Sequence, residues 1–84
     1  MHYQRVEATV KDIIARQFKV PYKDLAPETK LVDDLGADSL DMSEIALGVE
    51  EAFETDIPDS DLEGINSVAS MARYIQERLE ADAA

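Results

Sequence analysis

Cysteine is absent from this chain of 84 residues, and histidine occurs once, at His2. Without cysteine the chain has no disulfide framework, no thiolate nucleophile and no cysteine-based zinc site. A catalytic serine needs a base within hydrogen-bond reach, usually a histidine that a third group orients. His2 stands near the beginning of the sequence, and no Gly-x-Ser-x-Gly turn is present. We therefore expect no self-activated serine nucleophile in this chain.

Long apolar runs are missing as well. Stretches such as Ile45 to Val49 are far shorter than the ~20 residues that cross a bilayer. The first residues do not show a basic segment followed by an apolar one, which is the pattern of a secretion signal. The sequence therefore predicts a cytoplasmic protein that has no membrane partner.

Basic residues are absent from the middle of the chain. Between Leu31 and Ala72 there are twelve Asp or Glu residues and no Lys or Arg, whereas the rest of the chain has eight basic and seven acidic residues. The whole excess behind the net charge of -11 therefore lies in this segment. Such a field repels nucleic acid and attracts basic protein surfaces. A partner protein is favoured over nucleic acid, and an acidic surface that only keeps the chain soluble is the alternative.

Helical periodicity is the main pattern that is present. Near the start of the chain, apolar residues recur at spacings of three and four, which gathers them on one face of a helix of about four turns. The Val20-Pro21-Tyr22 segment stops this helix, because proline disfavours helical geometry in the residue before it. A long connection follows. The helix face consists of Tyr3, Val6, Val10, Ile13, Ile14 and Phe18, and the connection is anchored by Leu25, Leu31 and Leu35.

Helix signals return after this connection. Gly36 and Asp38 supply a turn and an N-cap for a second helix from about Ser39 to Glu54. After Pro58, the segment 59–65 is compatible with one short helical turn. Ser67 is the expected N-cap of a last helix, whose core face carries Val68, Met71, Ala72, Ile75 and Leu79. We predict a single all-α domain over residues 1–84, a four-helix bundle with three longer helices, one short helix and a long first loop.

The second helix has two distinct faces. Met42, Ile45, Val49 and Phe53 form an ordinary core stripe. The opposite face is acidic but also carries two leucines, and it consists of Leu40, Ser43, Glu44, Leu47, Glu51 and Glu54. Two leucines among carboxylates favour a docking surface, in which the leucines fill partner pockets and the glutamates meet Lys or Arg. Chance exposure of two leucines is the alternative.

Two polar segments remain open to more than one interpretation. Ser39 is either a residue that only begins a helix or an exposed hydroxyl that another enzyme modifies, since the neighbouring aspartates are too weakly basic to activate it. The segment Asp59 to Gly64 partly matches a calcium loop, but position twelve is Ser70 where a bidentate glutamate should close the site. We therefore expect no dedicated metal site.

Three stretches of the sequence together resemble the bacterial acyl carrier protein family. They are "ETKLVDD" at 28–34, "LGADSLD" at 35–41 and "VEEAFETDIPD" at 49–59, and the closing "YIQERL" at 74–79 extends the similarity over nearly the whole chain. A lone Asp-Ser-Leu would be weak evidence. Its register with the long loop, the acidic helix and the Ile-Pro-Asp turn makes the resemblance specific.

The resemblance implies a carrier without catalysis of its own. Ser39, within the motif Asp38-Ser39-Leu40, is implied to receive phosphopantetheine from coenzyme A through a separate phosphopantetheinyl transferase, whose magnesium activates the hydroxyl. Acyl groups are then carried as thioesters to acyl-transferring and chain-elongating enzymes of fatty-acid synthesis, and the carrier is a monomer. The implied partner surface is Leu40, Ser43, Glu44, Leu47, Glu50, Glu51 and Glu54. The implied acyl-chain pocket is Ile45, Ala46, Val49, Phe53, Ile65, Val68 and Met71.

Two residues depart from the family pattern. Ser43 stands where fatty-acid members usually have a branched apolar residue, which leaves a dedicated polyketide or aminoacyl carrier as the alternative. Gly48 lies in the middle of the second helix, where glycine costs ~1 kcal/mol relative to alanine. It allows close approach of another element, widens the acyl pocket, or is a tolerated weakness. An acidic adaptor or divalent-ion-binding protein is the alternative from another class.

Overall fold

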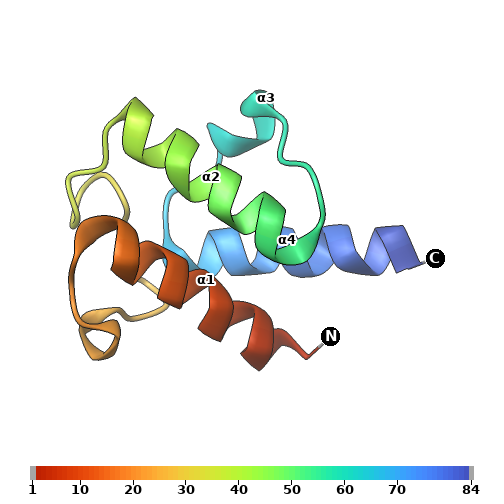
Figure 1. Cartoon of the computed structure of the whole chain (residues 1–84), viewed down its shortest axis with the longest axis horizontal. Coiled ribbons are helices and arrows are strands. Elements are labelled where there is room, and N and C mark those ends of the chain that lie inside the picture. Colours follow the sequence, from red (N-terminus) through yellow and green to blue (C-terminus); the bar gives the residue numbers. More distant parts are fainter. Residues whose placement is uncertain (1, 84) are drawn as a thin grey trace.

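The computed structural model describes residues 2–83 and, within them, is all-helical (Figure 1). Helix α1 spans Tyr3–Phe18, α2 spans Ser39–Phe53, α3 spans Asp59–Leu62 and α4 spans Val68–Ala83. A short 3-10 helix, η1, spans Tyr22–Asp24 in the first loop. No strand occurs in this part of the chain, which has one isolated bridge between Lys30 and Ser67. The predicted architecture of three longer helices and one short one is confirmed.

One continuous core joins the three long helices. Its fully buried side chains include Val6, Val10 and Ile14 from α1, and Ile45 and Val49 from α2. From α4 it includes Val68, Met71, Ala72 and Ile75. These residues belong to the predicted faces, whereas Tyr3, Ile13, Phe18, Met42 and Leu79 are only partly buried around them. Apolar periodicity therefore identified the correct face of each long helix.

The helix ends differ slightly from the prediction. Helix α1 ends at Phe18, before the Val20-Pro21 signal, because Lys19 adopts a left-handed conformation with φ of 55° and donates its N–H to Ala15 O. Helix α2 ends in the same way, with Glu54 at φ of 53°. The short helix α3 stops at Leu62 rather than extending to Ile65. Within the described residues, no helix has the length and apolar character needed to cross a membrane.

Gly48 allows α1 and α2 to approach closely. A methyl group added at Gly48 would lie 3.2 Å from Ile13 Cγ2, which is tighter than ordinary van der Waals contact. Ile13 belongs to α1, so the glycine removes bulk where the two helices meet. Of the three interpretations of Gly48, close approach is the one that this contact supports.

The long first loop is fixed to the beginning of α4. Backbone N–H groups of Val68 and Ala69 donate to Thr29 O and Pro27 O over 3.1 and 2.8 Å. Leu31 N donates to Asn66 O over 3.0 Å, and the Leu31 side chain is fully buried. Gly36 then turns the chain with φ of 72°, a left-handed conformation that glycine adopts readily. The loop therefore delivers the chain to the start of α2 in a defined position.

Candidate functional site

Ser39 is the first residue of α2 and stands between two interlocked aspartates. Asp41 N donates to Asp38 Oδ1 over 2.8 Å, and Asp38 N donates to Asp41 Oδ2 over 3.2 Å. These reciprocal bonds form a capping box and confirm Asp38 as the N-cap. The Ser39 side chain is exposed, and its hydroxyl has no hydrogen-bond partner within the described residues. The cap thus holds the turn while leaving the serine hydroxyl unused.

Local hydrogen bonds stabilise the negative charge of Asp41 in this turn. Hydrogen bonds from the Asp38 backbone and then from the Gln17 side chain hold the pKa of Asp41 below its ordinary value. Asp41 is therefore ionised near neutral pH. Gln17, near the end of α1, contacts Asp41 in this turn, whereas His2 is the N-cap at the other end of the same 16-residue helix, about 24 Å away at 1.5 Å per residue. The single histidine is thus remote from Ser39.

A groove of about 400 Å³ opens beside Ser39, between α2 and the α3 region. Its apolar surface comes from the first loop, from α2 and from the segment around α3. Two acidic residues, Asp59 and Glu63, also line it. The lining residues are Val32, Ser39, Met42, Ser43, Asp59, Leu62, Glu63 and Ile65. A group attached to the Ser39 hydroxyl therefore has an apolar surface within reach.

The side chains predicted to form an acyl-chain pocket are all buried. Ile45, Val49, Val68 and Met71 are fully buried, and Ala46, Phe53 and Ile65 are nearly so. Only Ile65 among these seven also lines the groove beside Ser39. The other six belong to the packed core and do not line the groove.

The predicted docking face of α2 is largely exposed. Leu40 and Leu47 expose 65% and 57% of their surfaces. Ser43, Glu44, Glu51 and Glu54 are also exposed. Glu50 differs, because it is half-buried and its Oε2 accepts a hydrogen bond of 2.8 Å from Ile57 N. Glu50 therefore ties α2 to the segment before α3, a contact that the sequence analysis did not foresee.

Within residues 2–81, no carboxylate of the acidic segment forms an ion pair with a basic side chain. The ion pair found in the described residues joins Arg16 to Asp12 on α1, over 3.2 Å. Residues 2–83 also contain no group of three or more Asp, Glu, His or Cys residues arranged to hold a metal ion. The twelve negative charges between Leu31 and Ala72 are thus left to repel one another.

We therefore expect added salt or millimolar magnesium to raise the melting temperature. Screening weakens repulsion between exposed charges, and a core of this size has little stability to spare. Circular dichroism melts at neutral pH measure the effect. A melting temperature that does not change with either addition would show that the folded structure already neutralises the acidic segment.

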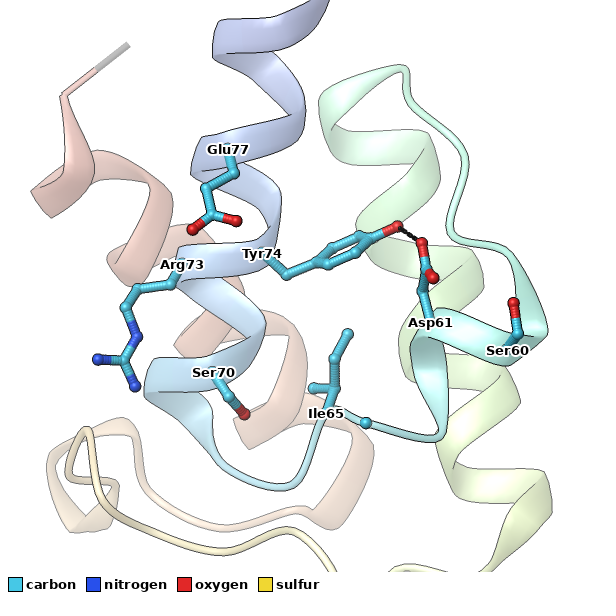
Figure 2. Close-up of a pocket in the computed structure, with 8 residues that line it drawn as sticks. Ser60, Asp61, Ile65, Ser70, Arg73, Tyr74 and Glu77 are labelled. Carbon is cyan, nitrogen blue, oxygen red and sulfur yellow. Dashed lines mark hydrogen bonds between the residues drawn. The ribbon is translucent and has the colours of Figure 1, made fainter.

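A second pocket, of about 450 Å³, lies between α3 and α4 (Figure 2). The Tyr74 hydroxyl on α4 donates to Asp61 Oδ2 on α3 over 2.6 Å. Burial, then this hydrogen bond and the charge of Asp61, raise the pKa of Tyr74 to about 12. The pocket does not include Ser39. The hydrogen bond between Tyr74 and Asp61 has a structural role, because it fastens the short helix α3 to α4.

Replacing Tyr74 by phenylalanine should loosen α3. Because the pKa of Tyr74 is raised on folding, the stability from its protonated hydroxyl is present below about pH 10 and is lost as the pH rises towards about 12. We expect Tyr74→Phe to lower the melting temperature at about pH 8 and to speed amide exchange in residues 59–65. The exposed Tyr22 supplies the control Tyr22→Phe. Equal exchange rates in wild type and Tyr74→Phe would contradict this role.

Sequence reasoning missed three residues with tertiary contacts, of which the first two lie at the site beside Ser39. Gln17 donates from α1 to two carboxylates of α2, and Val32 contributes an exposed apolar surface beside Ser39. Tyr74 is the third. Gln17 follows Ile13 by one helical turn, which was the available signal that its side chain faces α2. No local pattern signals the other two, because their partners are distant in sequence.

Comparisons with known proteins match most of the chain. A family model described as a phosphopantetheine attachment site matches residues 8–75. The chain is also 41% identical over 81 residues to an acyl carrier protein of Syntrophobacter fumaroxidans. This alignment covers 96% of the present chain and 100% of that protein. Both similarities extend over the whole of α2, the loop before it and α3.

Proposed function

The chain belongs to the acyl carrier protein family, and we propose that it carries its phosphopantetheine group on Ser39. Proteins of this family are carriers rather than enzymes. When bound, phosphopantetheine supplies the thiol that holds an acyl group as a thioester. Since the chain has no cysteine, a thiol must come from such a group.

The main support for this proposal is that the Ser39 hydroxyl is exposed and, within the described residues, unbonded. It is exposed, makes no hydrogen bond within the described residues, and begins a helix whose cap is supplied by Asp38. Attachment therefore breaks no contact that holds the fold together. The hydroxyl also stands beside the groove, so the residues present fit a long, flexible group attached there. Activation of the hydroxyl is left to the transferase, because the carboxylates of Asp38 and Asp41 that flank Ser39 are too weakly basic to activate it.

The groove beside Ser39 is a candidate binding surface for the acyl chain. Met42, Leu62 and Ile65 give it an apolar wall, and Ile65 also belongs to the buried core. An acyl chain in this groove is removed from water, which stabilises it by about 0.8 kcal/mol for each buried methylene group. We propose that longer chains reach the predicted pocket around Ile45, Val49 and Met71 by displacing α3, which is a single short turn.

The exposed face of α2 supports docking of partner enzymes. Leu40 and Leu47 offer apolar contacts near Ser39, and Glu44, Glu51 and Glu54 offer negative charges. The expected partners are the phosphopantetheinyl transferase and the acyl-transferring and chain-elongating enzymes, each with a basic surface. We propose that these enzymes belong to fatty-acid synthesis and that the carrier is a monomer. Ser43 supports the alternative of a dedicated pathway, because it is exposed on the same face and lines the groove.

Intact-mass measurement tests the attachment directly. The purified protein is incubated with coenzyme A, magnesium and a promiscuous phosphopantetheinyl transferase. The expected result is a gain of one phosphopantetheine group, which fragment ions assign to Ser39. Acyl-coenzyme A thioesters offered in place of coenzyme A should load the same site. An unchanged mass would favour the acidic adaptor, and a group mapped to another serine would contradict Ser39.

A further inference from the structure

The side chain of Gln17 joins the end of α1 to the turn that carries Ser39. Its Nε2 lies 3.1 Å from Asp41 Oδ1 and 3.0 Å from Glu44 Oε2. Both carboxylates belong to α2, three residues apart. An amide nitrogen has two hydrogens and no charge, so one group can donate to both carboxylates without cancelling either charge.

The packing of α1 on α2 brings Gln17 to this position. Ile13 meets the backbone of α2 at Gly48, and Gln17 lies one turn beyond Ile13 on the same face of α1. On α2, Glu44 lies one turn before Gly48 on the side that leads towards Ser39. The two helices therefore run in opposite directions along this contact. The close approach at Gly48 brings α1 near enough for the amide to reach both carboxylates.

The hydrogen bonds of Gln17 continue into the cap of α2. Asp41 accepts from Gln17 through Oδ1 and from Asp38 N through Oδ2. Asp38 and Asp41 stand on either side of the Ser39-Leu40 pair in sequence. Without Gln17, Asp41 would keep its place in the cap, but Glu44 would lose its partner and be repelled by Asp41. The Glu44 side chain would then sample several rotamers in water.

We propose that Gln17 is a positioning residue, whose amide holds Asp41 and Glu44 as a preformed pair of carboxylates beside Ser39 for a basic side chain of the transferase. The inference rests on the proposed attachment at Ser39. A side chain that is already ordered loses less conformational entropy on binding, which strengthens the complex. Lysine or arginine at this position would neutralise the pair and repel the basic partner. The neutral amide orders the carboxylates and preserves their charge.

The variant Gln17→Met tests this role, because methionine keeps the length of the side chain and removes both donors. In steady-state loading by the transferase, we expect the KM for the carrier to rise about three- to tenfold with kcat unchanged. Gln17→Asn, whose amide is one methylene group shorter, should give the same result if Gln17→Met folds poorly. Gln4→Met is the matched control, since Gln4 is exposed on the first turn of α1.

A double-mutant cycle separates positioning from a general loss of stability. If Gln17 acts through Glu44, Gln17→Met should have little further effect on KM in a Glu44→Gln background. Carbon-13 NMR of the carboxyl groups should also show the pKa of Asp41 rising when Gln17 is replaced. A KM equal to that of wild type, or fully additive effects in the cycle, would overturn the inference. If wild type itself is not loaded, the proposed attachment fails instead.

Discussion

Replacing Ser39 by alanine should abolish loading of phosphopantetheine and leave the fold intact. The acceptor oxygen disappears, and no other group can take its place in the register of the motif. The fold should persist because Asp38, not Ser39, supplies the cap through its bond with Asp41 N. The Ser39 side chain is exposed and makes no hydrogen bond within residues 2–83. Alanine also has a higher helix propensity than serine, so the change in stability should stay within about 0.5 kcal/mol.

Intact-mass analysis after incubation with the transferase measures this effect, and circular dichroism melts check the fold. Ser60→Ala is the matched control, because Ser60 is an exposed serine near the start of α3 and outside the groove beside Ser39. The control should load at the wild-type rate. Loading of Ser39→Ala to any comparable extent would sink the assignment of the attachment site.

Reversing the charge of Glu44 should slow loading about tenfold at low ionic strength, and the defect should shrink as salt is added. The carboxylate is exposed one turn beyond Leu40, and a lysine there would repel the basic surface of the transferase. Glu28→Lys is the matched control, because it makes the same change in net charge on an exposed loop residue outside α2. Equal defects in both variants would mean that only the total charge matters.

Truncation of Leu47 separates the apolar contribution of the same face. Leu47 is 57% exposed, so Leu47→Ala should weaken partner binding without unfolding the protein. Because the lost contact is apolar, the defect should depend little on salt, unlike that of Glu44→Lys. Loading kinetics at two salt concentrations, with melts of each variant, decide the matter. Normal loading in both Glu44→Lys and Leu47→Ala would show that the transferase does not dock on this face of α2.

Local and periodic features of this protein were predictable from sequence. The faces of the long helices follow from apolar spacing, as the burial of Val10, Ile45 and Ile75 shows. The cap at Asp38 was also predicted, because a capping box involves residues only three positions apart. The position of Ser39 at the start of α2 follows from that cap. The core faces of the long helices and the start of α2 could therefore be predicted from the sequence alone.

Contacts between segments distant in sequence were not predictable in the same way. Gln17 reaches Asp41 only because α1 and α2 cross at Gly48, and no spacing in the sequence specifies how near two helices come. The groove beside Ser39 likewise needs the loop at Val32 and the turn at Leu62 to meet. The family resemblance placed Glu50 on the partner surface, and its bond to Ile57 was missed because that bond depends on the path of a later loop. Each of these features is tertiary in origin.

The left-handed conformations of Lys19 and Glu54 have a consequence for engineering the protein. Each residue ends a helix with a positive φ that glycine adopts freely and that costs other residues ~1 kcal/mol or more. Lys19→Gly should therefore improve heat resistance and lies outside the acidic face. Glu54→Gly should relieve similar strain but would remove one carboxylate from that face. Of the two non-glycine residues with positive φ in residues 2–83, Lys19 is the one outside the proposed docking face, so a thermostable version of this carrier is best sought there.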